Sequence, residues 1–332
     1  MSFRSVLRVD PSPSPPWRFT RPRIDLSLAD GRKSDTTPME LRSRALELLA
    51  SYDGVSLTFT DGSKSSEGAG CAFVAHGATR SFSLPADASV FTTELAAILK
   101  ALSFIEVGDE ASHLILSDSL SSLLALRSFY PRHPLVQDIL LRVTSLYQAG
   151  KSVEFCWLPS HVGITGNELA DAAARRASSA QCTRRFPLPA SDLFPAISRF
   201  VRSQWQQLWD AQQNNKLRAI KPALSRWLSS SRRSRTEEVA LCRLRIGHTY
   251  ATHGYLLCGG DRPECTHCGE SLTVAHVLLT CRRLSGKRSH HLGYISPTVT
   301  LPDLLGDDSR WVLDGTLFSF IRSVSFLVTF HS

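Results

Sequence analysis

Long apolar runs are missing from this 332-residue sequence, although 42% of its residues are hydrophobic. No run approaches the ~20 consecutive apolar residues that are needed to span a bilayer, which excludes an integral membrane protein. The start of the chain carries a proline-rich stretch from Pro11 and lacks the continuous apolar core of a secretory signal. We therefore expect an intracellular protein, cytoplasmic or nuclear, that is not secreted and does not contact a membrane.

A disulfide framework is not expected either. The sequence has eight cysteines, and thiols inside the cell are kept reduced or bind metal ions. Cys71 and Cys156 fall within expected strands, so we interpret them as core residues. The remaining cysteines are candidates for metal ligands.

The net charge of +8 is distributed unevenly along the chain. Residues 1–180 carry 18 Lys and Arg against 19 Asp and Glu, whereas residues 181–332 carry 20 against 11. Because affinity for nucleic acid comes largely from neutralised phosphates, the second half is the better candidate for general polynucleotide binding. The first half is the better candidate for chemistry.

The chain is long enough for two modest domains. We expect residues 1–50 to form an N-terminal segment that is rich in Pro and Arg, loosely packed, and ends in a helix at residues 38–50. Residues 51–180 predict an α/β domain with the element order βββαβααβα. A proline-rich linker at residues 181–196 then leads to a basic, mainly helical region at residues 197–332.

Strands and helices within the α/β domain are predicted from their apolar periodicity. The expected strands are residues 55–60, 69–76, 79–85, 113–118 and 153–157, and the expected helices are residues 94–107, 119–129, a segment after Pro134, and 167–178. Thr92 or Thr93 is the expected cap of the first of these helices, which would place Glu94 in its first turn.

Four acidic residues occupy positions, after expected strands and on expected helices, that are typical of a metal-dependent nuclease. Asp61 and Asp118 follow apolar strand runs, whereas Glu94 and Asp171 belong to segments of helical period. Carboxylates at strand ends and on facing helices can converge on one point, where their mutual repulsion calls for divalent cations. The sequence therefore predicts a metal site.

These four residues, together with His161 in WLPSHVGITGNELAD, make the chain similar to the type 1 ribonuclease H family from about Val55 to Ser178. The ten-residue step from His161 to Asp171 is the most specific element of the resemblance. The resemblance implies a ribonuclease H-like fold, a mixed five-stranded sheet with helices on both faces. The local sequence around these residues most resembles the ribonuclease H segment of non-LTR (LINE-like) retrotransposon polyproteins.

The resemblance also implies an activity, namely hydrolysis of the RNA strand of RNA/DNA hybrids by an endonuclease with two Mg²⁺ ions, for which Mn²⁺ substitutes. Asp61 would bridge both ions, Glu94 and Asp118 would complete the site on the leaving-group side, and Asp171 would hold the ion that activates water. His161 would relay a proton or assist product release.

A second site is expected in the basic region, around residues 242–284. Cys265, Cys268, His276 and Cys281 have the spacing C-x2-C-x7-H-x4-C, and three thiolates with one imidazole are typical of structural Zn²⁺. The segment resembles the zinc-binding segment that follows ribonuclease H or reverse transcriptase in non-LTR elements. Alternative ligands are near by in the sequence: His248, His253, Cys258 and His267.

Other functions are compatible with parts of this pattern. No YxDD or FxDD polymerase motif is present, so the chain itself carries no reverse transcriptase active site, and an association with a reverse transcriptase is expected; whether a polymerase domain is encoded upstream is left open by the sequence. An inert, retroelement-derived nucleic-acid-binding protein that uses the zinc segment is the main alternative. A DDE transposase shares the broad architecture, but the loop that contains His161 favours hydrolysis. The sequence leaves the oligomeric state open.

Overall fold

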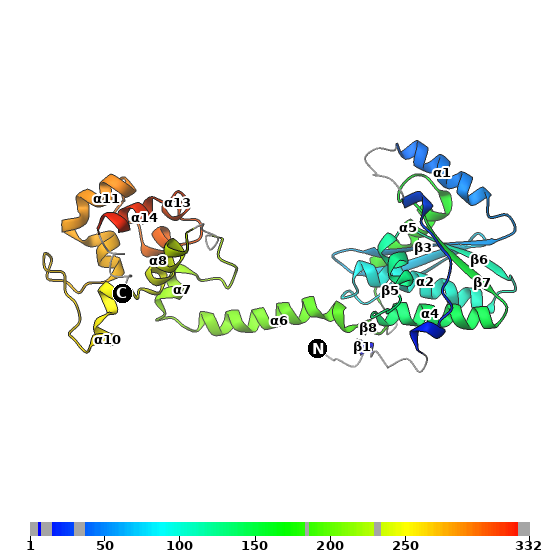
Figure 1. Ribbon diagram of the computed structural model, residues 1–332, viewed down its shortest axis with the longest axis horizontal. Helices are drawn as coiled ribbons and strands as arrows, with labels where there is room; N and C mark the ends of the chain where they lie inside the picture. Colours follow the sequence, from blue (N-terminus) through cyan, green and yellow to red (C-terminus); the bar gives the residue numbers. More distant parts are fainter. Residues whose placement is uncertain (1–5, 8–14, 30–36, 183–185, 229–233, 325–332) are drawn as a thin grey trace. The chain divides into compact units, whose positions relative to one another are not determined.

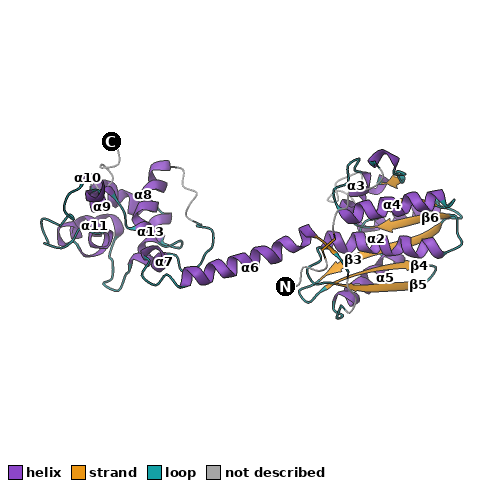
Figure 2. Cartoon of the chain, turned by 90° about the horizontal axis from the view of Figure 1, so that it is seen from below, coloured by secondary structure: helices purple, strands orange, loops and turns teal. Residues whose placement is uncertain are grey.

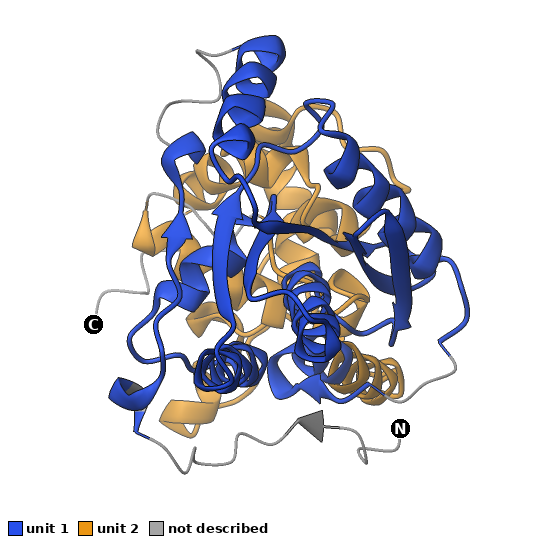
Figure 3. Cartoon of the chain, turned by 90° about the vertical axis from the view of Figure 1, so that its right-hand side faces the viewer, with its two compact units in different colours: residues 1–198 blue, residues 199–332 orange. Residues whose placement is uncertain are grey.

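The computed structural model describes residues 6–7, 15–29, 37–182, 186–228 and 234–324. The chain divides into two compact units, residues 1–198 and residues 199–332 (Figure 3). Each unit has its own hydrophobic core. Within the described ranges, no helix combines the length and the apolar character needed to cross a membrane.

A six-stranded mixed sheet forms the centre of the first unit, with strand order β2-β7-β6-β3-β4-β5 (Figure 1). Its strands are β2 (Ile24–Asp25), β3 (Ser56–Lys64), β4 (Ala69–Ala75), β5 (Ala78–Leu84), β6 (Ser112–Ser117) and β7 (Ser152–Trp157). β3 pairs antiparallel with β4 and parallel with β6, so both kinds of ladder meet at β3. The expected mixed α/β fold is confirmed.

Helices cover both faces of this sheet (Figure 2). They are α1 (Pro38–Ala50), α2 (Val90–Val107), α3 (Leu120–Arg127), α4 (Pro134–Gln148) and α5 (Thr165–Ser178). Alternation along β4 separates the two faces: Phe73 joins the core that contains α2 and α4, whereas Ala72 packs with Ala173 and Ala174 of α5. Small residues on both sides let α5 approach the sheet closely.

The start of α2 differs from the expectation. Ser89, and not Thr92 or Thr93, is the N-cap, and its Oγ accepts a hydrogen bond from the backbone N–H of Thr92 at 3.1 Å. The helix begins at Val90, so Glu94 lies beyond its first turn. Both threonines are fully buried in the helix, where tertiary packing outweighs their preference for a cap position.

The prediction that the first residues of the chain are loosely packed is wrong for the part of them that the structure describes. β2 pairs parallel with β7 and adds a sixth strand to the five that were expected. Phe19 and Leu28 are buried in the core of the first unit. Two short 3-10 turns, Pro16–Arg18 and Ser27–Ala29, flank β2. Two-residue strands and isolated buried residues have no periodicity, which is why the sequence pattern did not indicate them.

The expected linker at residues 181–196 also contains regular structure in its described part. β8 (Leu188–Pro189) pairs parallel with β1 (Val6–Leu7), and α6 spans Ala190–Asp210. α6 therefore begins inside the expected linker, seven residues before the helical region expected at residues 197–332. Pro195 lies inside α6, beyond its first turn, so the helix lacks the backbone hydrogen bond that an N–H at this position would donate.

The second unit is helical in its described part. Its helices are α7 (Lys216–Ile220), α8 (Arg235–Ile246), α9 (Tyr250–His253), α10 (Tyr255–Cys258), α11 (Ser285–Leu292), α12 (Leu301–Leu305), α13 (Arg310–Leu313) and α14 (Thr316–Ser323). Ser234 caps α8, as its spacing to Glu237 predicts. Phe318 and Phe320 of α14 are fully buried and belong to the same hydrophobic core as Leu244 of α8.

Candidate metal centre and zinc-type cluster

Two neighbouring parallel strands bring Asp61 and Asp118 together. Thr60 of β3 is in register with Ser117 of β6, so the next residue of each chain segment is one of the two aspartates. β3 continues past Asp61 to Lys64, because its pairing with β4 extends further than its pairing with β6. The indole N–H of Trp157 donates a hydrogen bond to the backbone carbonyl of Asp118 at 3.0 Å and fixes the turn that carries it.

A close contact between β3 and α2 adds Glu94 to this pair. A Cβ atom at Gly62 would lie 2.5 Å from the backbone carbon of Thr93 and still closer to the backbone nitrogen of Glu94. Only glycine permits this approach. One ligand atom from each of Asp61, Glu94 and Asp118 consequently lies within 4.8 Å of the other two.

Burial and mutual repulsion raise the pKa values of these carboxyl groups. Asp61 and Glu94 are only 6% and 7% exposed. Burial and the charges of Asp118 and Asp171 raise the pKa of Asp61 to about 8. Burial and the charge of Asp61 raise the pKa of Glu94 well above its ordinary value. Burial also raises the pKa of Asp118, against a hydrogen bond from Asn167 that lowers it.

The donor set of this cluster fits a hard divalent cation. All three side chains offer carboxylate oxygens, the ligands that Mg²⁺ and Mn²⁺ prefer. Oε2 of Glu94 is buried and has no hydrogen-bond partner within the described part of the chain. A buried charged oxygen without a donor is costly, so a cation at this point would stabilise it.

Asp171 approaches the same cluster from α5 but is paired differently. Its Oδ1 accepts a hydrogen bond from Nε of Arg175 at 2.6 Å, and its Oδ2 contacts the other arm of that guanidinium. Asp171 is close enough to raise the pKa values of Asp61, Glu94 and Asp118, yet the tightly grouped set does not include it. Three of the four predicted carboxylates thus converge directly, and the fourth is held by an arginine.

His161 lies in the loop before α5, beside Asp171. Its Nδ1 is 3.7 Å from Oδ2 of Asp171, and its side chain is 64% exposed. Its φ of +57° is unusual for a residue with a side chain and indicates a constrained loop. Nε of Arg42 in α1 donates a hydrogen bond to the carbonyl of Gly163 at 3.3 Å and holds this loop from outside.

Two residues of the site escaped the sequence analysis, Glu168 and Arg175. One ligand atom of Glu168 lies within 4.8 Å of ligand atoms of His161 and Asp171. Glu168 precedes Asp171 by three positions and Arg175 follows it by four, so all three share one face of α5. Helical spacing from Asp171 is the signal that would have found both.

The second unit brings together the four residues with metal-ligand spacing. One ligand atom each from Cys265, Cys268, His276 and Cys281 lies within 4.8 Å of the others. Sγ of Cys281 is 3.9 Å from Sγ of both Cys265 and Cys268. This separation is too long for a disulfide and close to the edge of a tetrahedron with Zn–S bonds of about 2.3 Å.

Local backbone structure prepares this cluster for a metal ion. A tight turn joins Cys265 to Cys268 and ends at Gly269, which has a φ of +71°. Backbone hydrogen bonds from His267, together with groups on His276 and Cys268, lower the pKa of Cys265 to about 6 and favour the thiolate that binds metals.

The ring of His276 is oriented for ligation. Its Nδ1 lies 2.9 Å from Oε2 of Glu270, while its Nε2 is buried and without a partner in the described structure. A carboxylate on one ring nitrogen is typical of histidines whose other nitrogen binds a metal. The cluster is therefore compatible with zinc. Of the alternative ligands, His248 and His253 stack on each other, with ring centroids 3.9 Å apart.

Comparison with known protein families agrees with the geometry of the first unit. Residues 54–179 match the family model of RNase H, so this part of the chain is an RNase H domain. The matched range contains β3 to α5 and all five site residues discussed above. RNase H domains hydrolyse RNA in hybrids and normally use divalent metal ions. A comparison with curated proteins finds no match.

Proposed function

We propose that this chain is an RNase H of type 1, an endonuclease that cleaves the RNA strand of RNA/DNA hybrids and leaves 3′-hydroxyl and 5′-phosphate ends. The observation that carries the proposal is the convergence of Asp61, Glu94 and Asp118 at a buried point of an RNase H domain. Their raised pKa values and the unpartnered oxygen of Glu94 show that a bound cation would stabilise the ionised carboxylates.

In this proposal two Mg²⁺ ions bind at the carboxylates, where they would supply the activation of water and the stabilisation of the negative charge of the reaction. Asp61, Glu94 and Asp118 would hold the ions, and Asp171, which is paired with Arg175 in this structure, would be a further ligand. The exposed imidazole of His161, close to Asp171, is placed to carry a proton between the reacting groups and solvent.

Selection of RNA requires contacts with the 2′-hydroxyl in the minor groove of the hybrid. Residues 46–180 carry 9 basic against 14 acidic residues, so the RNase H domain by itself has little general affinity for phosphates. We assign non-specific binding of the substrate to the basic region, residues 181–332. The sequence motifs favour a retrotransposon origin, with a reverse transcriptase as partner.

Cleavage of a labelled RNA/DNA hybrid in Mg²⁺ tests the proposal. Asp118→Asn removes one ligand charge at a half-buried position and should lower the rate by at least about a hundredfold, since metal-ligand carboxylates act directly on the reacting groups. Asp138→Asn is the matched control, because Asp138 lies on α4, away from the cluster. Persistent cleavage by Asp118→Asn, with the fold intact by circular dichroism, would refute the assignment.

A further inference from the structure

A pocket of about 280 Å³ lies in the second unit, between the C-terminal end of α8 and the short helices α9 and α10. Arg243, His248, Tyr250 and His253 contribute to its walls, together with the exposed Leu256. None of the residues that line it is acidic. The pocket is separate from the four residues of the zinc-type cluster.

Aromatic rings form a stack at this pocket. The rings of His248 and His253 are nearly parallel, with an interplanar angle of 17° and centroids 3.9 Å apart. The ring of Tyr255 continues the stack, with its centroid 6.2 Å from that of His253. His248 is exposed and His253 is half-buried, so the outer ring presents its face to solvent.

The stack is held in a fixed orientation by its own backbone. Gly247 ends α8 in the left-handed conformation, with a φ of +79°, and turns the chain so that His248 points back toward α9. Thr249 and Thr252 are buried and cap α9 reciprocally. Oγ1 of Thr252 hydrogen-bonds Nδ1 of His253 at 2.8 Å, which fixes the plane of that ring.

Positive charge surrounds the stack. Burial lowers the pKa of His253, and the charges of His248, Lys216 and Arg262 lower it further, which places these groups near its ring. The Lys216 side chain passes over Gly247, next to His248. Imidazole rings can stack on the face of a base, while the lysine and arginine side chains beside them attract phosphate groups.

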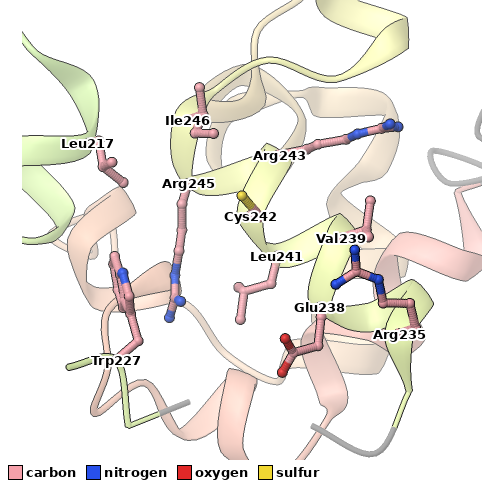
Figure 4. A pocket seen from close by; sticks show the side chains of 10 residues that line it. All are labelled: Leu217, Trp227, Arg235, Glu238, Val239, Leu241, Cys242, Arg243, Arg245 and Ile246. Carbon is pink, nitrogen blue, oxygen red and sulfur yellow. The ribbon is translucent and has the colours of Figure 1, made fainter. Parts of the chain in front are cut away.

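The two arginines near the C-terminal end of α8, Arg243 and Arg245, point to different sides of the helix (Figure 4). Arg245 is buried, stacks on Trp227 at 3.7 Å, and donates a hydrogen bond to the carbonyl of Leu305, so it serves the core. Arg243 extends away from Trp227 and lines the pocket beside the histidines. The fold thus places one arginine in the core and the other at the pocket.

We propose that this pocket binds a single-stranded polynucleotide, with an unpaired base stacked on the outer ring, His248, which His253 supports from behind, and with backbone phosphates beside Lys216, Arg243 and Arg262. Bases are accessible for stacking only when they are unpaired, and an aromatic platform flanked by cations is the chemistry that binds them without sequence preference. This function goes beyond the hydrolysis proposed for the RNase H domain and does not depend on it.

Fluorescence anisotropy with a labelled oligothymidylate of about 15 nucleotides tests the site in the intact, zinc-loaded chain. The double substitution His248→Ala with His253→Ala should weaken binding about tenfold, since loss of base stacking has effects of this size. The pair His248→Phe with His253→Phe keeps both ring faces and should retain most of the affinity.

A matched control is available in the same unit. His290 and His291 on α11 also contact each other, with centroids 4.7 Å apart in an edge-to-face arrangement that offers no common platform. Alanine at both positions should leave binding unchanged. Equal affinity of the His248/His253 alanine variant and the wild type would overturn the proposal, as would loss of binding in the phenylalanine variant with an unchanged melting curve.

The salt dependence of binding gives a second, independent test. Lys216→Gln changes an exposed side chain and should reduce the slope of log affinity against log salt by about one. An unchanged slope would remove Lys216 from the site. Because oligothymidylate is not a substrate for hydrolysis of RNA, these outcomes are independent of hybrid cleavage, and either proposal can fail while the other holds.

Discussion

At the metal centre, backbone packing keeps the carboxyl groups of Asp61 and Glu94 close together against their mutual repulsion. The close approach of Gly62 to α2 leaves these side chains no room to separate. Arg175 relieves part of the repulsion, since its charge lowers the pKa of Asp61 against the larger effect of burial. Single side chains around the site therefore set how readily it accepts a cation.

Arg175 competes with metal ions for Asp171. Arg175→Gln would free both carboxylate oxygens of Asp171, so we expect this variant to reach half-maximal hybrid cleavage at a lower Mg²⁺ concentration than the wild type. The measurement is a Mg²⁺ titration of the cleavage rate. Arg176→Gln, at the next position of α5, is the control and should leave the titration unchanged. A higher Mg²⁺ requirement in Arg175→Gln would contradict the competition.

The pKa of Asp61 predicts how stability depends on pH without Mg²⁺. The folded chain keeps the proton up to about pH 8, whereas an ordinary aspartate releases it near 3.8. Between these values the folded state binds more protons, so the free energy of unfolding falls as pH rises, by on the order of a few kcal/mol. Asp61→Asn removes this dependence.

Thermal melts of wild type and Asp61→Asn at pH 6 and pH 8.5, in buffer without Mg²⁺, check this expectation. The melting temperature of the variant should exceed that of the wild type, and by more at the higher pH. Added Mg²⁺ should raise the melting temperature of the wild type alone. Parallel pH curves for the two proteins would show that Asp61 ionises normally in the fold.

Among the secondary-structure elements, α5 decides whether Asp171 reaches the site. It packs on β3 and β4 through Ala173 and Ala174, and β4 offers Ala72 and Gly70 in return. A Cβ atom at Gly70 would lie 2.5 Å from the backbone nitrogen of Ser178 and 2.7 Å from the carbonyl oxygen of Ala174. Because backbone atoms surround this position, the helix itself would have to move.

Gly70→Ala should therefore displace α5, destabilise the first unit by about 1–3 kcal/mol, and reduce hybrid cleavage. Chemical denaturation and the cleavage rate measure the two effects. Gly108→Ala is the control within the same unit, because its new Cβ would meet the end of the flexible Glu110 side chain at 3.0 Å. Equal stability of the two variants would show that α5 adjusts without cost.

For the whole molecule, we expect the two units to depend on different metal ions. The zinc-type cluster supports the core of the second unit, since Val274, Val277 and Leu278 lie between its ligands and pack into that core. Structural zinc contributes on the order of 10 kcal/mol, comparable to the whole stability of a domain. The RNase H domain has a separate core that contains none of these residues.

Cys268→Ala should consequently unfold the second unit and leave the RNase H domain folded. Limited proteolysis with mass spectrometry should find cleavage confined to residues 199–332, while hybrid hydrolysis at saturating substrate persists. Cys242→Ala, at an exposed cysteine outside the cluster, should resist proteolysis like the wild type. Retention of zinc and of protease resistance by Cys268→Ala would exclude Cys268 as a ligand of a structural zinc site.

Much of this molecule is determined by local sequence. The alternating run around Leu57 and the continuous apolar run that begins at Leu114 specify β3 and β6, and an aspartate at the end of each strand segment predicts where the two carboxylates meet. The spacing of the cysteines and His276 likewise predicts their cluster. These signals are local, so they are readable in the chain without knowledge of its neighbours.

Tertiary structure alone decided the remainder. The pairing of β2 with β7, the pairing of Asp171 with Arg175, and the stack of His248 on His253 depend on which backbone surfaces pack together. The secondary-structure propensity of each residue does not indicate which distant residue it will contact. Packing energies depend on shape and distance in three dimensions, so these contacts cannot be read from local sequence. The chain therefore specifies which groups are present at each site, and the fold decides how they are paired and charged.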